Sequence, residues 1–168
     1  MPAPTADRPR MPGYGLLDAG EGRGLLPWAW AEERLTQARN YWVSTAGEDG
    51  RPHAMPVWAV WLDGAAYFST GRQTRKARNL AHRPECVLSP ESGAEAVVVE
   101  GAAEEIVDRE TLERVAGVYT DKYGMGFPPE EPVYRVRPLV AFGLIEGAEE
   151  FAGAATRWRF PDTRSPDT

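Results

Sequence analysis

Residues 41–62 read YWVSTAGEDGRPHAMPVWAVWL and carry the clearest indication of the fold class. Tyr41, Val43 and Thr45 alternate along one side, which is the period of a half-buried strand. Asp49-Gly50 then supplies the residues of a tight turn, and residues 52–62 resume as a strand. The stretch therefore predicts a β-hairpin.

The end of this stretch is apolar at every position from Val57 to Leu62. A strand tolerates such a run only when both of its faces are covered, as in a closed barrel or at a subunit interface. A second turn at Asp63-Gly64 leads to a third strand over residues 65–70. Three antiparallel strands in succession favour a mainly β domain with short turns.

The rest of the chain adds short helices and further strands. Helices are predicted over residues 28–38, over residues 75–82 behind an N-cap at Thr74, and after Asp108. Strands are predicted over residues 86–89, 96–107, 134–146 and 156–160. The second of these strands carries Gly101 at a bulge, and the last is expected at the sheet edge.

The two ends of the chain differ in composition from the middle. Residues 1–24 are rich in Pro, Gly and Arg and hold few aliphatic side chains, so they predict a flexible N-terminal arm. Residues 161–168 predict a disordered tail. Residues 25–160 form the one domain that a chain of 168 residues is expected to contain.

Composition excludes several classes of function. Nineteen Lys and Arg against twenty-five Asp and Glu give a net charge of -6, which argues against nucleic acid as a partner. The one cysteine, Cys86, excludes an intramolecular disulfide, and its burial as a structural thiol is expected. With only two widely spaced histidines the chain matches no zinc spacing, so no metal site is expected.

The chain also lacks the signals of membrane attachment or export. No apolar run approaches the roughly 20 residues that a membrane helix needs. The Pro-rich start lacks the apolar centre of a signal peptide. We therefore expect a cytoplasmic protein with no membrane partner.

Residues 70–78, TGRQTRKAR, carry most of the functional information. Four cations, Arg72, Arg75, Lys76 and Arg78, fall within this segment without a carboxylate. Cations in the first turn of a helix face the positive end of its dipole, so an anion would relieve the repulsion. Free backbone N–H groups, the Thr74 hydroxyl and the side chains of Arg75 and Lys76 would together form a phosphate cradle. A solvated basic helix face is the alternative.

Other residues have plainer interpretations. His53 lies on a predicted strand and is expected to be a core or edge residue rather than a base. Trp58 and Trp61 are expected to pack, although an aromatic ring beside a planar cofactor would look the same. Glu104-Glu105 point to opposite faces of a strand and make a poor acid–base pair. No Walker loop, dinucleotide fingerprint or nucleophile elbow occurs, and the catalytic residues stay unassigned.

Five segments form one pattern: ARNYWVST (38–45), DGRPH (49–53), MPVW (55–58), YFSTG (67–71) and TRKARNL (74–80). This pattern resembles the pyridoxamine-phosphate-oxidase-like split β-barrel family, and within it the flavin- and deazaflavin-dependent oxidoreductases. The resemblance runs from about residue 28 to 107 and more loosely to 159. It implies an FMN-binding-like split β-barrel with six or so antiparallel strands plus short helices, and a homodimer with two cofactor sites at its interface.

The resemblance implies roles for nine residues. The family holds the cofactor phosphate where the third strand ends and the next helix begins, which implies Ser69, Thr70, Thr74, Arg75 and Lys76. It lays the flavin ring along the second strand, which implies Met55, Pro56, Val57 and Trp58. Dimerisation would let Trp158-Arg159 reach the site of a partner.

The resemblance also implies a cofactor and a reaction. The pyridoxamine phosphate oxidases themselves carry a basic residue after the apolar core of the second strand, and residues 58–62 hold none, which argues against phosphorylated pyridoxal substrates. MPVW combined with TRKARNL resembles the branch that uses the deazaflavin coenzyme F420. We therefore expect an F420-dependent oxidoreductase that transfers a hydride to or from a small organic substrate.

Two alternatives stay open at this point. One is an FMN-dependent oxidase or reductase of the same fold, and the other is a non-catalytic carrier of a flavin, haem or tetrapyrrole. The cofactor would supply the chemistry while the protein positions its ring. Residues 122–132 are expected to form either a lid over the substrate or an ordinary connection.

Overall fold

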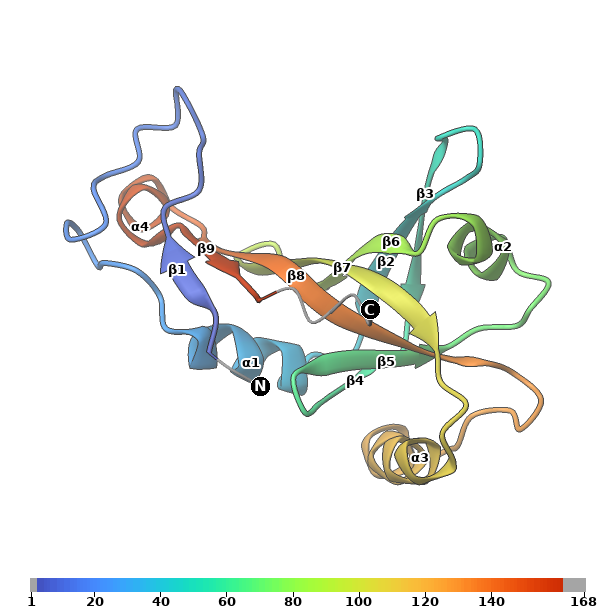
Figure 1. The fold of residues 1–168 in the computed structure, drawn as a ribbon. Helices are drawn as coiled ribbons and strands as arrows, with labels where there is room; N and C mark the ends of the chain where they lie inside the picture. The colour runs from blue at the N-terminus through green and yellow to red at the C-terminus, as the bar shows by residue number, and fades with distance from the viewer. Residues whose placement is uncertain (1–2, 162–168) are drawn as a thin grey trace, which may run out of the picture.

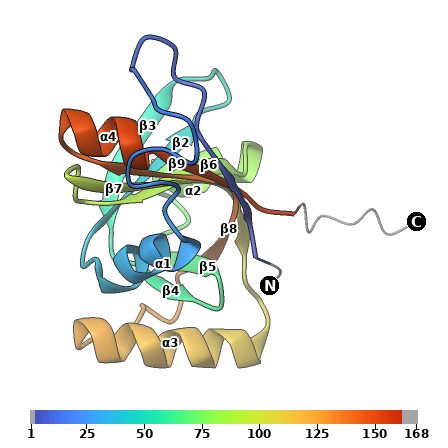
Figure 2. The ribbon, with the colours of Figure 1, turned by 90° about the vertical axis from the view of Figure 1, so that its left-hand side faces the viewer.

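The computed structural model describes residues 3–161, and within that range an antiparallel sheet of nine strands curls into a split barrel with four helices around it (Figures 1 and 2). The strands are β1 (Thr5–Asp7), β2 (Tyr41–Ala46), β3 (Pro52–Val57), β4 (Val60–Leu62), β5 (Ala65–Ser69), β6 (Glu85–Pro90), β7 (Glu95–Glu105), β8 (Val133–Ile145) and β9 (Thr156–Arg159). The helices are α1 (Trp28–Gln37), α2 (Arg75–His82), α3 (Arg109–Tyr123) and α4 (Ala148–Ala154). The mainly β class is confirmed, and the strands outnumber the six or so expected.

The long strand β8 organises the sheet. The strand order is β1-β9-β8-β7-β6-β2-β3, while β5 pairs with both β4 and β8. The first part of β8, from Val133 to Val136, pairs with β5, and the part from Val140 to Gly143 pairs with β9. One strand thereby joins both halves of the barrel.

The predicted bulge at Gly101 is confirmed. Glu100 pairs with Val140 and Gly101 pairs with Pro138, so that Leu139 is the extra residue. A Cβ atom on Gly101 would collide with the carbonyl oxygen of Arg137. Glycine is therefore required where the two longest strands bend.

The single strand predicted over residues 52–62 is wrong, because the chain leaves the sheet at Trp58 and Ala59. β3 stays at the sheet edge beside β2, whereas β4 pairs with β5. Side chains of α3 then bond the buried backbone of Ala59. The Ala59 N–H donates to the Tyr123 hydroxyl (3.0 Å), and the Ala59 carbonyl accepts from Lys122 Nζ (2.9 Å). Figure 2 shows α3 beneath β4 and β5, where it supplies these partners.

The N-terminal segment, for which the sequence predicts a flexible arm, contains β1 and contacts the C-terminal part of the chain. β1 pairs with β9, so β9 is an interior strand rather than the predicted edge. The Arg8 guanidinium donates to five backbone carbonyls, those of Leu17, Asp18, Glu21, Gly153 and Ala155. Hydrogen bonds from one side chain thus replace the apolar burial that the segment lacks. The tail predicted over residues 161–168 lies, after Pro161, outside the described residues.

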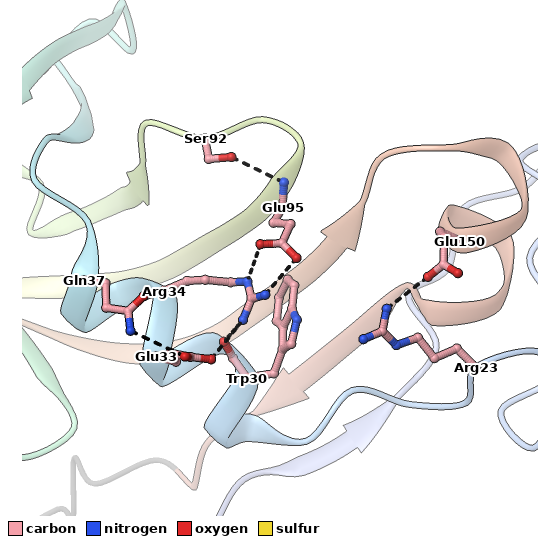
Figure 3. A network of polar contacts seen from close by, with 8 residues as sticks. All are labelled: Arg23, Trp30, Glu33, Arg34, Gln37, Ser92, Glu95 and Glu150. Carbon is pink, nitrogen blue, oxygen red and sulfur yellow. Dashed lines mark hydrogen bonds and ion pairs between the residues drawn. The ribbon is translucent and has the colours of Figure 1, made fainter.

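Helix α1 is anchored across one end of the barrel by Arg34 (Figure 3). The Arg34 guanidinium donates to both carboxylate oxygens of Glu95 (2.8 and 3.1 Å) and to the Trp30 carbonyl (2.9 Å). It also lies 3.9 Å from the centre of the Trp30 ring. Nearby, Arg23 pairs with Glu150 of α4 (3.1 Å), so that the N-terminal segment is held on a second side. None of the helices within residues 3–161 is long and apolar enough to span a membrane.

Tryptophan rings form the centre of the core. Trp158 is 1% exposed, and its ring lies 5.2 Å from that of Trp28. Arg159 pairs with Asp7 (3.2 Å). The expectation that a partner's site is reached is therefore wrong for Trp158, because its indole is enclosed within its own chain, whereas for the exposed Arg159 it stays a prediction.

Gly143→Ala tests this packing, since a Cβ atom at residue 143 would lie 2.5 Å from the Trp158 ring and 3.0 Å from the Trp30 ring. We expect the free energy of unfolding to fall by about 1–3 kcal/mol, because two buried rings must shift. Gly117→Ala is the matched control: this α3 residue has nothing within 4 Å of its Cβ position. Alanine there should raise stability by up to about 1 kcal/mol. Chemical denaturation checks both values, and equal effects would contradict the packing argument.

Candidate functional site

The start of α2 has the cap that the sequence predicts. Thr74 Oγ1 accepts a hydrogen bond from the Ala77 N–H (3.2 Å) and lies 3.0 Å from Thr70 Oγ1. The N–H groups of Arg75 and Lys76 occupy the first helical turn, where no carbonyl of the helix can accept them. Two backbone donors therefore remain available to an anion at this end of the helix.

The four cations of residues 70–78 differ in whether a carboxylate pairs with them. Arg72 donates to both oxygens of Glu105 (2.5 and 3.1 Å), and this contact lowers the pKa of the Glu105 carboxyl. Arg75, Lys76 and Arg78 have no ion-pair partner among residues 3–161. Lys76 is partly buried, and burial lowers the pKa of its ammonium group. A partly buried, unpaired lysine is unusual for a merely solvated basic face.

A groove of about 590 Å³ lies between α2 and the turn of the β2–β3 hairpin. Its lining residues are Gly47, Glu48, Asp49, Arg51, Arg75, Arg78 and Asn79. Asn79 Nδ2 donates to Thr45 Oγ1 (2.9 Å), and both side chains are buried, so α2 is fixed against β2. Figure 1 shows α2 beside this hairpin.

The nine residues assigned from the family pattern fall into three places. Thr70, Thr74, Arg75 and Lys76 gather at the start of α2, and the hydroxyl of the adjoining Ser69 donates to the Pro132 carbonyl (3.1 Å). Met55, Pro56 and Val57 lie on the edge strand β3, with Met55 45% exposed. Trp58 lies apart, stacked on Tyr123 of α3 with ring centres 4.5 Å apart.

His53 lies on the edge strand β3, in line with the expectation of a core or edge residue, and its neighbours include the start of α2. It is paired with Thr45 across the β2–β3 ladder. Its Nδ1 atom is buried and has no hydrogen-bond partner in the part of the chain that the structure describes. Burial lowers the pKa of His53, and the charges of Arg75 and Lys76 lower it further. No signal in the sequence links residue 53 to residues 75 and 76, since strand pairing brings them together.

Lys122 occupies a second polar position, at the break between β3 and β4. Its amine donates to the Tyr41 hydroxyl (2.8 Å) and to the Ala59 carbonyl (2.9 Å). Burial, assisted by the charge of Arg39, lowers the pKa of Lys122 to about 8. Within residues 3–161 no carboxylate pairs with this amine. Sequence reasoning treated Lys122 only as the start of a loop.

Two further expectations concern metals and the thiol. Cys86 is buried, and burial raises the pKa of its thiol to about 12, which suits a structural cysteine. The described residues contain no group of three or more His, Cys, Asp or Glu side chains placed to hold a metal ion.

The sequence and the fold identify the family. A family model described as pyridoxamine 5'-phosphate oxidase matches residues 29–146. This span contains β2 to β8 and the whole of the α2 site. The chain belongs to this family of split β-barrel proteins, as the sequence pattern predicts. No curated protein sequence matches the chain.

Solved structures share the fold but carry different descriptions. A conserved hypothetical protein from Mycobacterium tuberculosis is 23% identical with a TM-score of 0.61, over 69% of this chain and 82% of that one. An F420 reductase is 24% identical with a TM-score of 0.54, over 66% and 94%. The heme storage protein HutZ from Vibrio cholerae is 15% identical with a TM-score of 0.56, over 64% and 87%. These similarities show a common fold.

Lys122 generates a prediction about stability and pH. The folded chain holds this amine with a pKa of about 8, against 10.5 for an ordinary lysine. Between these pH values the unfolded chain binds more protons, so the free energy of unfolding contributed by Lys122 rises with pH. We expect the stability of the wild type relative to Lys122→Met to increase from about pH 8 to about pH 10. Urea denaturation at several pH values checks this, and a flat or falling difference would refute it.

Proposed function

We propose that the protein is an oxidoreductase that binds the deazaflavin coenzyme F420 and transfers a hydride to or from a small organic substrate. The observation that carries the proposal is the start of α2, where three cations lack carboxylate partners within the described residues and two backbone N–H groups are free. Such a site attracts a phosphate group. The proposal is further supported by family membership and by the sequence pattern of the deazaflavin branch.

The site residues have distinct tasks in this proposal. The phosphate is bound by Arg75, Lys76 and the N-cap residue Thr74. The edge strand β3 supports the ring with Met55, Pro56 and Val57. When bound, the cofactor supplies the hydride chemistry. The protein contributes binding, orientation and the exclusion of water, and no acid or base side chain is assigned to the reaction. The Trp58 ring is stacked on Tyr123, so it would contact the cofactor only from the side of α3.

A double substitution tests the cradle. Arg75→Ala with Lys76→Ala removes two charge-assisted contacts, each of about 1.5–3 kcal/mol, so the dissociation constant for F420 should rise at least about 100-fold. Fluorescence titration of the purified protein measures this constant. Arg72→Ala is the matched control, because Arg72 already pairs with Glu105 and should change the affinity little. Unchanged affinity in the double variant would refute the assignment.

Two other functions share the same site. An FMN-dependent oxidase or reductase would use the same cradle, and parallel titrations with FMN and oxidised F420 separate these two cofactors. A non-catalytic carrier of a flavin, haem or tetrapyrrole is favoured by the likeness to a heme storage protein. A carrier would bind reduced cofactor without oxidising it when organic acceptors are offered. Stopped-flow oxidation of the reduced cofactor therefore separates an enzyme from a carrier.

The outer face of the sheet supports the homodimer expected from the family pattern. Ser44, Val87, Glu100 and Val140 lie directly opposite one another across β2, β6, β7 and β8. With Leu139 they line a mainly apolar groove of about 500 Å³. An apolar surface of this kind on an acidic protein fits a contact between two copies of the chain.

Val87→Glu tests the dimer. A second carboxylate, directly opposite Glu100, would add charge repulsion and desolvation on association, so the dimer dissociation constant should rise at least about tenfold. Analytical ultracentrifugation measures the change. Val107→Glu is the matched control, since Val107 is 84% exposed and lies beyond the end of β7. A dimer that survives Val87→Glu unchanged would place the interface elsewhere.

A further inference from the structure

His53 combines an unsatisfied ring nitrogen with two neighbouring cations. Its Nδ1 atom is one of three buried side-chain nitrogens without a hydrogen-bond partner in the described residues. The other two are the indole nitrogens of Trp30 and Trp158, which lie in the apolar core. His53 instead lies on the edge strand β3, close enough to Arg75 and Lys76 for both charges to act on it. A buried polar atom without a partner calls for an explanation.

Strand register directs the His53 side chain toward α2. His53 is directly opposite Thr45, and such cross-strand partners project from the same face of a sheet. The Thr45 hydroxyl accepts from Asn79 of α2, so this is the face on which α2 packs. The Thr45 hydroxyl accepts from Asn79, and no hydrogen bond joins it to the His53 Nδ1 atom.

The surroundings of His53 are positively charged. Arg75 and Lys76 are the charged groups of α2 that act on the ring. From β2 its neighbour is the neutral Thr45. At the hairpin turn, Asp49 is engaged by Arg51 (3.2 Å), and Glu48 lines the groove beyond. Among residues 3–161, no carboxylate forms an ion pair with His53.

We propose that His53 is a third anion-binding side chain of the α2 cradle and that it takes up a proton when the phosphate group of the cofactor binds. The inference rests on the proposed function, because it requires a phosphate at Arg75 and Lys76. Because Nδ1 is buried, Nε2 is the ring nitrogen that a phosphate oxygen can reach, and an imidazolium carries a proton to donate at Nε2 as well as at Nδ1. Burial lowers the pKa of His53 and the charges of Arg75 and Lys76 lower it further, and a bound phosphate offsets these two charges. Binding and protonation thereby strengthen one another.

The coupling has a measurable consequence for affinity. Where one proton is taken up on binding, affinity rises as the pH falls, by at most about tenfold per pH unit. We expect the dissociation constant of His53→Gln for F420, divided by that of the wild type, to be about five times larger at pH 6 than at pH 8. Any titration of the cofactor itself is common to both proteins, so the ratio of the two dissociation constants reports His53 alone.

Nuclear magnetic resonance gives a readout that does not depend on activity. The chain has only two histidines, His53 and His82, so the two imidazole signals can be assigned with a His82→Gln variant. His82 lies at the last turn of α2, is exposed, and serves as the internal reference. On addition of saturating F420, the titration midpoint of His53 should rise. His82→Gln should keep the pH dependence of binding that His53→Gln loses.

The outcomes separate the inference from the function on which it rests. If F420 binds through Arg75 and Lys76 while the His53 midpoint stays unmoved and His53→Gln keeps the wild-type pH profile, the inference is overturned and the cradle stands. If the wild type does not bind F420, or if the Arg75→Ala, Lys76→Ala protein binds it equally well, the proposed cradle fails and the role of His53 fails with it.

Discussion

The structure depends on the hydrogen bonds that the buried backbone N–H and carbonyl of Ala59 make where the chain leaves the sheet. A strand that breaks inside a core leaves polar backbone atoms that water cannot reach. Here α3 provides Tyr123 for the N–H and Lys122 for the carbonyl. Because α3 side chains replace the strand partners of Ala59, β3 can remain at the sheet edge while β4 continues into the second half of the barrel. The open edge beside α2 is a consequence of that separation.

The same break separates two polar environments. On the side of α2, Arg75 and Lys76 gather in a protein whose net charge is -6, and their charges reach His53 on the edge strand. On the side of α3, one lysine is held between a tyrosine hydroxyl and a carbonyl, and its pKa falls because it is buried. The first arrangement is suited to an external anion, whereas the second already satisfies the backbone. This contrast is why the proposed cofactor site is placed at α2.

Local features of the structure could be predicted well because each depends on neighbouring residues. The β2–β3 hairpin follows from alternation and a turn, the Thr74 cap from one hydroxyl before a helix, and the bulge from Gly101 within an otherwise regular strand. The features that the sequence did not predict depend mostly on residues far apart in the chain. The pairing of β1 with β9 and the contacts of Arg8 with Gly153 and Ala155 join residues nearly the full length of the chain apart. Helix α4 was missed as well, since its N-cap residue, Gly147, makes no side-chain cap.

The family, the mainly β class and the cationic start of α2 could be read from the sequence alone, because each is carried by short contiguous segments with a fixed spacing. Packing in space set which cations lack partners among residues 3–161, since Arg72 is neutralised by Glu105 from a distant strand. It also decided that His53 belongs beside Arg75 and Lys76, and that Trp58 packs on α3 instead. The physical reason is that charge balance and burial depend on neighbours in space, and strand pairing sets those neighbours across long separations in the chain.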